Sequence, residues 1–186
     1  MSESRARFGD RLDVGLQGKT AVLIGGGPGI GQAVAHAFVA ADCTTVVTDV
    51  NLVAAKGTCD MLGPKAEPLH VDVLDRASVR AMLADVVERH GAPIGVVDVV
   101  GVARAKTFED TKDEDWDVMQ NLNLRQQFIV AQEAVRVIQP GGSYVAIASL
   151  NGTVSSPFNI AYGSAKAGLV SLVRSLAVEI APPESG

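Results

Sequence analysis

The 186-residue sequence has few of the residues that mark several common protein classes. Its two cysteines, Cys43 and Cys59, are too few for a disulfide framework. Lysine and arginine number 16 against 21 acidic residues, and this net charge of −5 argues against a nucleic-acid-binding protein. No apolar run reaches the roughly 18 residues that a membrane span requires. The three histidines are scattered and predict no metal site.

Glycine is abundant and aromatic residues are scarce. With 19 glycines and 4% aromatics, the sequence favours a core of small aliphatic residues in a layered α/β protein. The first ten residues are polar and do not resemble a secretory signal, so we expect a cytoplasmic protein. Residues 1–15 are treated as a polar N-terminal extension. Residues 16–186 have the length of one domain.

Short strand-like runs alternate with longer helical segments. The expected strands are 19–24, 44–48, 66–71, 95–100 and 143–148, and the expected helices are 30–41, 52–62, 76–90, 113–139 and 160–180. Thr111 and Glu114 have the spacing of a capping box at the start of the fourth helix. The alternation predicts parallel strands with right-handed crossovers, which is a doubly wound parallel sheet. Its ligand should lie at the carboxyl ends of the strands.

A glycine-rich loop lies between the first expected strand and the first expected helix. Glycines there let a ligand approach the backbone closely, and the helix N-terminus offers free N–H groups to a pyrophosphate. A tight turn with no ligand would also use glycines, but the strand–loop–helix context favours a dinucleotide site. The loop residues predicted to bind the cofactor are Gly25, Gly27, Pro28, Gly29, Ile30 and Gly31.

Acidic residues end the second and third expected strands. Asp49 lies 18 residues after Gly31, about where a carboxylate binds the adenosine ribose in this fold. Because that carboxylate would repel a 2′-phosphate, the sequence predicts NAD, with NADP less favoured. Asp72 and Val73 are placed to flank the adenine ring. The alternative for Asp49 is a solvated aspartate at a strand end, and the alternative for Asp72 is a strand-end acid that caps a turn.

Tyr162 and Lys166 are spaced i, i+4, so a helix would place the phenol and the ammonium on one face. A nearby positive charge favours the ionised phenol, which makes tyrosine usable as a general acid or base. Ser149 lies 13 residues before Tyr162, just beyond the fifth expected strand. Its hydroxyl could hold a substrate carbonyl or alcohol beside the phenol.

With the glycine loop, Ser149, Tyr162 and Lys166 in this order, the chain resembles the short-chain dehydrogenase/reductase family from about Leu16 onward. The resemblance implies a Rossmann fold and an NAD(H)-dependent oxidoreductase that acts on an alcohol or ketone. It implies that Tyr162 exchanges a proton with the substrate, Lys166 holds the nicotinamide ribose and Ser149 orients the substrate oxygen. Asn123 matches the family's helical asparagine, which supports a water-linked proton relay. Tyr162 and Lys166 are therefore predicted both as catalytic residues and as cofactor contacts.

Two positions depart from the family pattern. Ile24 stands where the glycine motif usually begins with threonine, so the loop is expected to be held differently. Where the family carries Asn-Asn-Ala-Gly, this chain reads Asp98-Val99-Val100-Gly101, and Gly101 is still predicted to bind the cofactor. The change could weaken the cofactor pocket, or Asp98 could accept the same backbone N–H groups. We favour retained binding with altered stability.

The third departure is length, because about five strands are expected and the family's last two strands have no counterpart. One hypothesis is an active enzyme. Another is a truncated, non-catalytic nucleotide-binding or interaction protein, and an incomplete product of a longer gene is a third. The apolar faces of the helices 113–139 and 160–180 are expected to support a homo-oligomer. The substrate and the direction of the reaction cannot be read from the sequence.

Overall fold

Five short segments form one parallel sheet with the strand order β3-β2-β1-β4-β5. The computed structural model describes residues 14–181, so most of the expected N-terminal extension and the last five residues lie outside the described residues. The strands are β1 (Thr20–Ile24), β2 (Thr44–Asp49), β3 (Ala66–His70), β4 (Gly95–Asp98) and β5 (Ser143–Ala146). Chain crossovers therefore run in opposite directions on the two sides of β1, as the doubly wound prediction requires.

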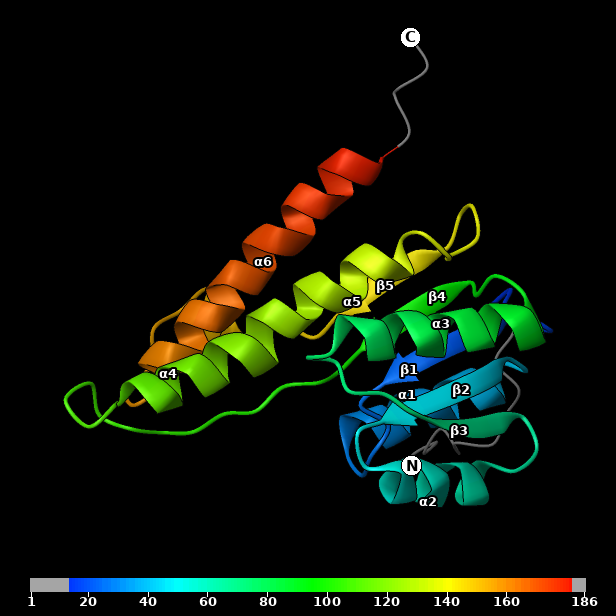
Figure 1. Ribbon diagram of the computed structural model, residues 1–186, viewed down its shortest axis with the longest axis horizontal. Helices are drawn as coiled ribbons and strands as arrows, with labels where there is room; N and C mark the ends of the chain where they lie inside the picture. Colours follow the sequence, from blue (N-terminus) through cyan, green and yellow to red (C-terminus); the bar gives the residue numbers. More distant parts are fainter. Residues whose placement is uncertain (1–13, 182–186) are drawn as a thin grey trace, which may run out of the picture.

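Helices cover both faces of this sheet (Figure 1). The α-helices are α1 (Ile30–Ala40), α2 (Leu52–Leu62), α3 (Arg76–His90), α4 (Asp113–Gln120), α5 (Gln126–Ala134) and α6 (Ile160–Ile180), of which α4 and α6 pack on each other rather than on the sheet. Successive residues of a strand point to opposite faces. Val22 and Ile24 accordingly join a core cluster with residues of α3 and α5, whereas Leu23 joins a second cluster with residues of α1 and α2. Both cores are built from small aliphatic side chains, as the composition predicts.

Three strands end earlier than predicted. The segments 66–71, 95–100 and 143–148 end as strands at His70, Asp98 and Ala146. Asp98 accepts a hydrogen bond from the backbone N–H of Val100, which closes a turn and removes that N–H from the strand ladder. The last residue pair between β4 and β5 is Asp98 with Ala146, so these two strands end at the same level of the sheet.

The predicted single helix 113–139 is wrong in two respects. A π-helical segment, η1 (Asn121–Arg125), separates α4 from α5, and α5 ends at Ala134 rather than at Gln139. Single π-turns inside helices occur frequently at functional sites. The predicted capping box is also wrong, because the backbone N–H of Lys112 donates to Asp115 while Thr111 donates to the backbone oxygen of Thr107.

The long helix α6 packs against α4, against η1 and against a short 3-10 turn, η2 (Leu150–Gly152). In Figure 1 its N-terminal end lies beside α4, and its C-terminal end points away from the sheet. Gly168 allows close packing on η1, because a Cβ there would lie 2.8 Å from Leu124. Within residues 14–181, none of the helices is long and apolar enough to cross a membrane.

An ion-pair cluster joins α3 to α5. Glu133 is 4% exposed and receives hydrogen bonds from Arg80 and Arg76, while Arg136 approaches its other oxygen at 3.1 Å. The hydrogen bonds from Arg80 and then Arg76 lower the pKa of Glu133 to about 2. The ionised carboxylate therefore stabilises the folded chain.

We predict that Glu133→Gln lowers the free energy of unfolding by about 1–3 kcal/mol at pH 7, because the buried group loses charged partners. The contribution is complete above the unfolded pKa near 4.3 and disappears as the pH falls toward about 2. Urea unfolding followed by circular dichroism measures it. Glu88→Gln, at an exposed position of α3, is the control. A difference between wild type and Glu133→Gln that is unchanged at pH 2 would contradict the assignment.

Candidate functional site

The glycine loop folds so tightly that side chains are excluded at two of its positions. A Cβ on Gly31 would lie 2.0 Å from the backbone oxygen of Gly25, and one on Gly26 would lie 2.1 Å from Val47. Gly25 also adopts a φ of +89°, which favours glycine. The loop leads into α1 at Ile30, and the first N–H groups of a helix have no acceptor within the helix, which suits binding of an anion.

This loop lacks the family threonine and is held by β2 and α2. The backbone N–H groups of Gly25 and Gly26 both donate to the backbone oxygen of Thr48, at 2.8 and 2.9 Å. The hydroxyl of Thr58 on α2 donates to the backbone oxygen of Gly26 at 2.7 Å. These contacts fix the loop against β2 and α2.

A cavity of about 440 Å³ lies at the carboxyl ends of β1, β2, β3 and β4. Its lining includes seven of the residues predicted to bind a cofactor, which are Gly25, Gly27, Pro28, Asp49, Asp72, Val73 and Gly101. Gly29, Ile30 and Gly31 lie outside the lining and form the start of α1. The sequence did not predict Val50, Leu74 and Leu122 as lining residues, because single aliphatic residues after strands carry no distinctive pattern.

The two acidic residues of this cavity accept hydrogen bonds from backbone N–H groups. Asp49 accepts from the backbone N–H of Gly27 at 3.1 Å and from that of Asn51 at 2.9 Å. Asp72 accepts from the backbone N–H of Leu74 at 2.9 Å. Asp49 therefore bridges the glycine loop and the start of α2, which fixes its carboxylate at the cavity wall.

Gly101 connects this cavity to the predicted catalytic residues. A Cβ on Gly101 would lie 2.8 Å from Asn123 Oδ1 and 3.3 Å from Lys166 Nζ. Asn123, within η1, donates to the backbone oxygens of Val102 and Met119 and accepts from the Val102 N–H. The segment after β4, the π-helical segment and α6 thus meet at one glycine.

Lys166 is 3% exposed and donates to the backbone oxygen of Ile147 at 2.7 Å. Burial lowers the pKa of its ammonium, and Asp98 partly opposes that effect. Its Nζ lies 5.8 Å from the centre of the Tyr162 ring, so the structure brings this predicted pair together. Tyr162 is half-buried in the first turn of α6.

Ser149 begins the 3-10 turn η2 after β5. Its hydroxyl oxygen accepts from the backbone N–H of Asn151 at 3.2 Å, which caps the turn. Gly152 lies so close to α6 that a Cβ would be 2.8 Å from the Lys166 carbonyl. The turn is therefore seated directly on the helix that carries Tyr162 and Lys166.

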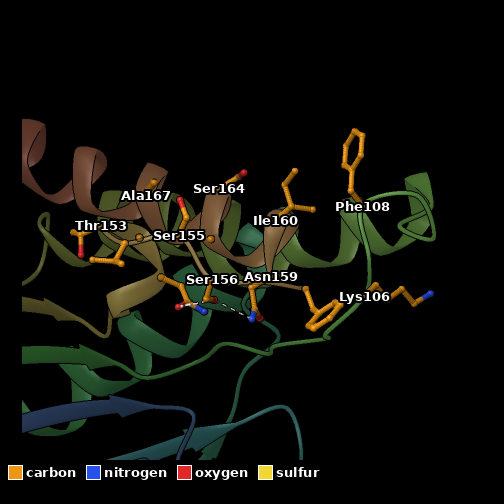
Figure 2. Close-up of a pocket in the computed structure, with 14 residues that line it drawn as sticks. Lys106, Phe108, Thr153, Ser155, Ser156, Asn159, Ile160, Ser164 and Ala167 are labelled. Carbon is orange, nitrogen blue, oxygen red and sulfur yellow. Dashed lines mark hydrogen bonds between the residues drawn. The ribbon is translucent and has the colours of Figure 1, made fainter.

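A second cavity, of about 480 Å³, lies between the segment 151–159 and the N-terminal half of α6 (Figure 2). Figure 2 shows the hydrogen bond by which Asn159 donates to Ser156, at 3.2 Å. The backbone N–H of Lys106 donates to the backbone oxygen of Phe158 at 2.9 Å, which brings the segment after β4 to the same rim. The lining residues on α6 are Ile160, Gly163, Ser164 and Ala167, which lie within two residues of Tyr162 or Lys166 in the sequence.

Comparisons with known proteins agree with this geometry. Residues 25–184 match the family model described as "Enoyl-(Acyl carrier protein) reductase". The 3-oxoacyl-[acyl-carrier-protein] reductase FabG of Thermotoga maritima is 30% identical over 171 residues, which cover 89% of this chain and 70% of that protein. The FabG of Escherichia coli is also 30% identical, with 69% of its length covered.

Solved structures give the same result. A short-chain dehydrogenase/reductase from Brucella melitensis superposes with a TM-score of 0.86 at 29% identity, covering 90% of this chain and 71% of that one. One from Burkholderia xenovorans, described as a putative member of the family, has a TM-score of 0.83 at 31% identity, with 88% and 69% covered. The chain thus corresponds to about 70% of the length of these relatives. It belongs to the short-chain dehydrogenase/reductase family of oxidoreductases.

Proposed function

We propose that this chain is an NAD(H)-dependent oxidoreductase that interconverts an alcohol and a ketone, with Tyr162 as general acid/base. The observation that carries the proposal is the position of Gly101. It lines the 440 Å³ cavity and also touches Asn123 and Lys166, so a ligand of that cavity can extend to the Tyr162–Lys166 pair. The curated relatives that we describe are named as reductases of acyl-carrier-protein substrates, which fits carbonyl chemistry.

A dinucleotide fits the residues present. The φ of +89° at Gly25 and the 2.0 Å between a Cβ on Gly31 and the Gly25 oxygen fit the tight turn and close helix packing of a dinucleotide-binding loop. The backbone N–H groups at the start of α1, from Ile30 and Gly31, would donate to the pyrophosphate, and Gly25, Gly27 and Pro28 would lie against it. Asp49 would bind the adenosine ribose, Asp72 and Val73 would flank the adenine, and Tyr162 and Lys166 would bind the nicotinamide ribose. We propose NAD over NADP because the Asp49 carboxylate would repel a 2′-phosphate.

The chain's own residues would place the substrate and move a proton. When bound, the nicotinamide supplies or accepts the hydride. Tyr162 would give its phenolic proton to a carbonyl oxygen, or remove the proton of an alcohol, and the ammonium of Lys166 would favour the ionised phenol. Ser149 would orient the substrate oxygen. The Asn123 side chain is occupied by Val102 and Met119, so we assign it a positioning role, and its part in a water-linked relay remains a prediction.

Self-association remains a prediction, as does a cytoplasmic location. Apolar side chains lie exposed on the helices for which an interface was predicted. They are Trp116 on α4, Phe128 on α5, and Ile160, Val178 and Ile180 on α6. A second copy of the chain could cover these faces, which fits a homo-oligomer.

The first test concerns the cofactor site at the glycine loop. Gly31→Ala places a methyl group against the backbone of Gly25, so we expect the loop to open and NADH affinity to fall at least about 10-fold, with a loss of stability of about 1–3 kcal/mol. Gly57→Ala on α2 is the control, because a Cβ there would have no atom within 4 Å. Fluorescence titration and urea unfolding measure both effects. Equal NADH affinity in the two variants would contradict a cofactor site at the glycine loop.

The second test concerns the choice between NAD and NADP. Asp49→Asn keeps the size of the side chain and removes its charge, so we expect the ratio of the NADP to the NAD dissociation constant to fall about 10-fold or more. Isothermal titration calorimetry with both nucleotides measures the ratio. Asp85→Asn, which removes a carboxylate from a surface ion pair on α3, should leave the ratio unchanged. A wild-type chain that prefers NADP would contradict the proposal.

The third test concerns the phenol. Tyr162→Phe removes the proton donor and should reduce turnover of secondary alcohols or ketones by about 10²–10⁴-fold while NADH affinity is retained. Absorbance of NADH follows the reaction, and calorimetry follows binding. A full rate in Tyr162→Phe would refute the mechanism. Absent turnover in the wild-type chain, with NADH still bound, would favour the non-catalytic nucleotide-binding alternative.

A further inference from the structure

Asp98, where the family carries asparagine, lies at the end of β4 with its side chain completely buried. One carboxyl oxygen, Oδ1, accepts from the backbone N–H of Val100 at 2.9 Å. The expectation that Asp98 can accept backbone N–H groups is confirmed for this bond. A buried carboxyl needs further partners, because an isolated ionised group in the interior is costly.

Two buried amides face this carboxyl. Gln126 and Gln127 are both fully buried at the start of α5, and both interact with Asp98. Among the described residues, however, Asp98 Oδ2, Gln126 Oε1 and Gln127 Nε2 are left without a hydrogen-bond partner. Most buried polar atoms in folded proteins are paired, so three such atoms in one cluster require an explanation.

A single proton would change which of these atoms can pair. A neutral carboxyl carries an O–H donor, which suits the acceptor Gln126 Oε1. An ionised carboxylate is an acceptor only, which suits the donor Gln127 Nε2. Gln127 keeps the same orientation in both cases, since its Oε1 accepts from the Tyr144 hydroxyl at 2.6 Å.

The titratable groups that interact with Asp98 are Lys166 on α6 and Tyr144 on β5. Lys166 is linked to Asp98 through the backbone as well, because Ile147 accepts from the Lys166 ammonium and donates its N–H to the Asp98 backbone oxygen at 3.2 Å. Tyr144 stays protonated, since burial raises the pKa of its phenol well above the usual value. The charge of Asp98 and the charge of Lys166 therefore depend on each other.

We propose that Asp98 is a proton-linked positioning residue, whose buried carboxylate keeps the ammonium of Lys166 charged and so sets the pH range over which the Tyr162–Lys166 centre holds its cofactor. The assignment of Lys166 to cofactor binding rests on the function proposed above. The charge coupling between Asp98 and Lys166 does not, and it can be tested without any ligand.

The sign of the effect follows from burial. Burial raises the pKa of Asp98 to about 7, while the Val100 N–H and the charge of Lys166 act in the opposite direction. The folded chain therefore binds more protons than the unfolded chain between about pH 4 and pH 7. Asp98 consequently reduces stability as the pH rises through that window. Above it, the carboxylate is charged and opposes loss of the proton from Lys166.

The first experiment measures urea midpoints of the ligand-free chain from pH 5 to pH 9. Asp98→Asn keeps the acceptor for Val100 and cannot ionise, so the Asp98-dependent fall in stability should be absent, whereas Asp85→Asn should retain it. Lys166→Met should move that fall to higher pH by about one unit, because a cation no longer favours the carboxylate. A purely structural role would change the midpoints of Asp98→Asn equally at every pH, and that result would overturn the proposal.

The second experiment measures the NADH dissociation constant of the same proteins from pH 6 to pH 10. In wild type and Asp85→Asn, binding should weaken only where Lys166 loses its proton. In Asp98→Asn, the fall in NADH affinity at alkaline pH should begin about one pH unit lower. Without the negative charge of Asp98, Lys166 loses its proton more easily. If NADH affinity falls at the same alkaline pH in Asp98→Asn and in wild type, the proposal is overturned. If wild type fails to bind NADH at any pH, the proposed function fails, and the stability profiles alone decide whether Asp98 and Lys166 are coupled.

Discussion

Close packing of three chain segments at Gly101 is the constraint on which the rest of the site depends. The turn after β4, the π-helical segment and α6 can meet there only because the glycine has no side chain. Asn123 ties the first two segments together through Val102 and Met119. Lys166 ties the third to the end of β5 through Ile147. A larger residue at Gly101 would separate the cofactor cavity from the Tyr162–Lys166 pair.

The sheet order explains why these segments arrive at one place. The strand that follows β1 in the sequence, β2, pairs on one side of it, and β4 pairs on the other side. The carboxyl ends of β1 and β4 therefore lie side by side, and the loops that follow them run in opposite directions. The glycine loop occupies one side of this gap and Gly101 the other. Asp98 ends β4 three residues before Gly101, and its buried carboxyl interacts with Lys166.

Much of this arrangement could be predicted from the sequence, because alternating β-branched runs and glycine loops follow from local geometry. The cavity contains seven predicted cofactor residues, and Tyr162 and Lys166 share a helix face. The π-helical segment around Asn123 was missed, since periodicity does not distinguish it from an α-helix. The Gln126–Gln127 amides around Asp98 were missed for another reason. Their role comes from tertiary burial, and two adjacent glutamines in a helix give no local signal.

The central claim is that a nicotinamide dinucleotide extends from the glycine loop past Gly101 to Tyr162 and Lys166. A crystal structure of the 186-residue chain with NADH tests this most directly. The account predicts the pyrophosphate against residues 25–31, the adenosine ribose at Asp49 and the nicotinamide ribose against Lys166. A dinucleotide bound elsewhere, or density that stops short of Gly101 in a fully occupied site, would contradict it.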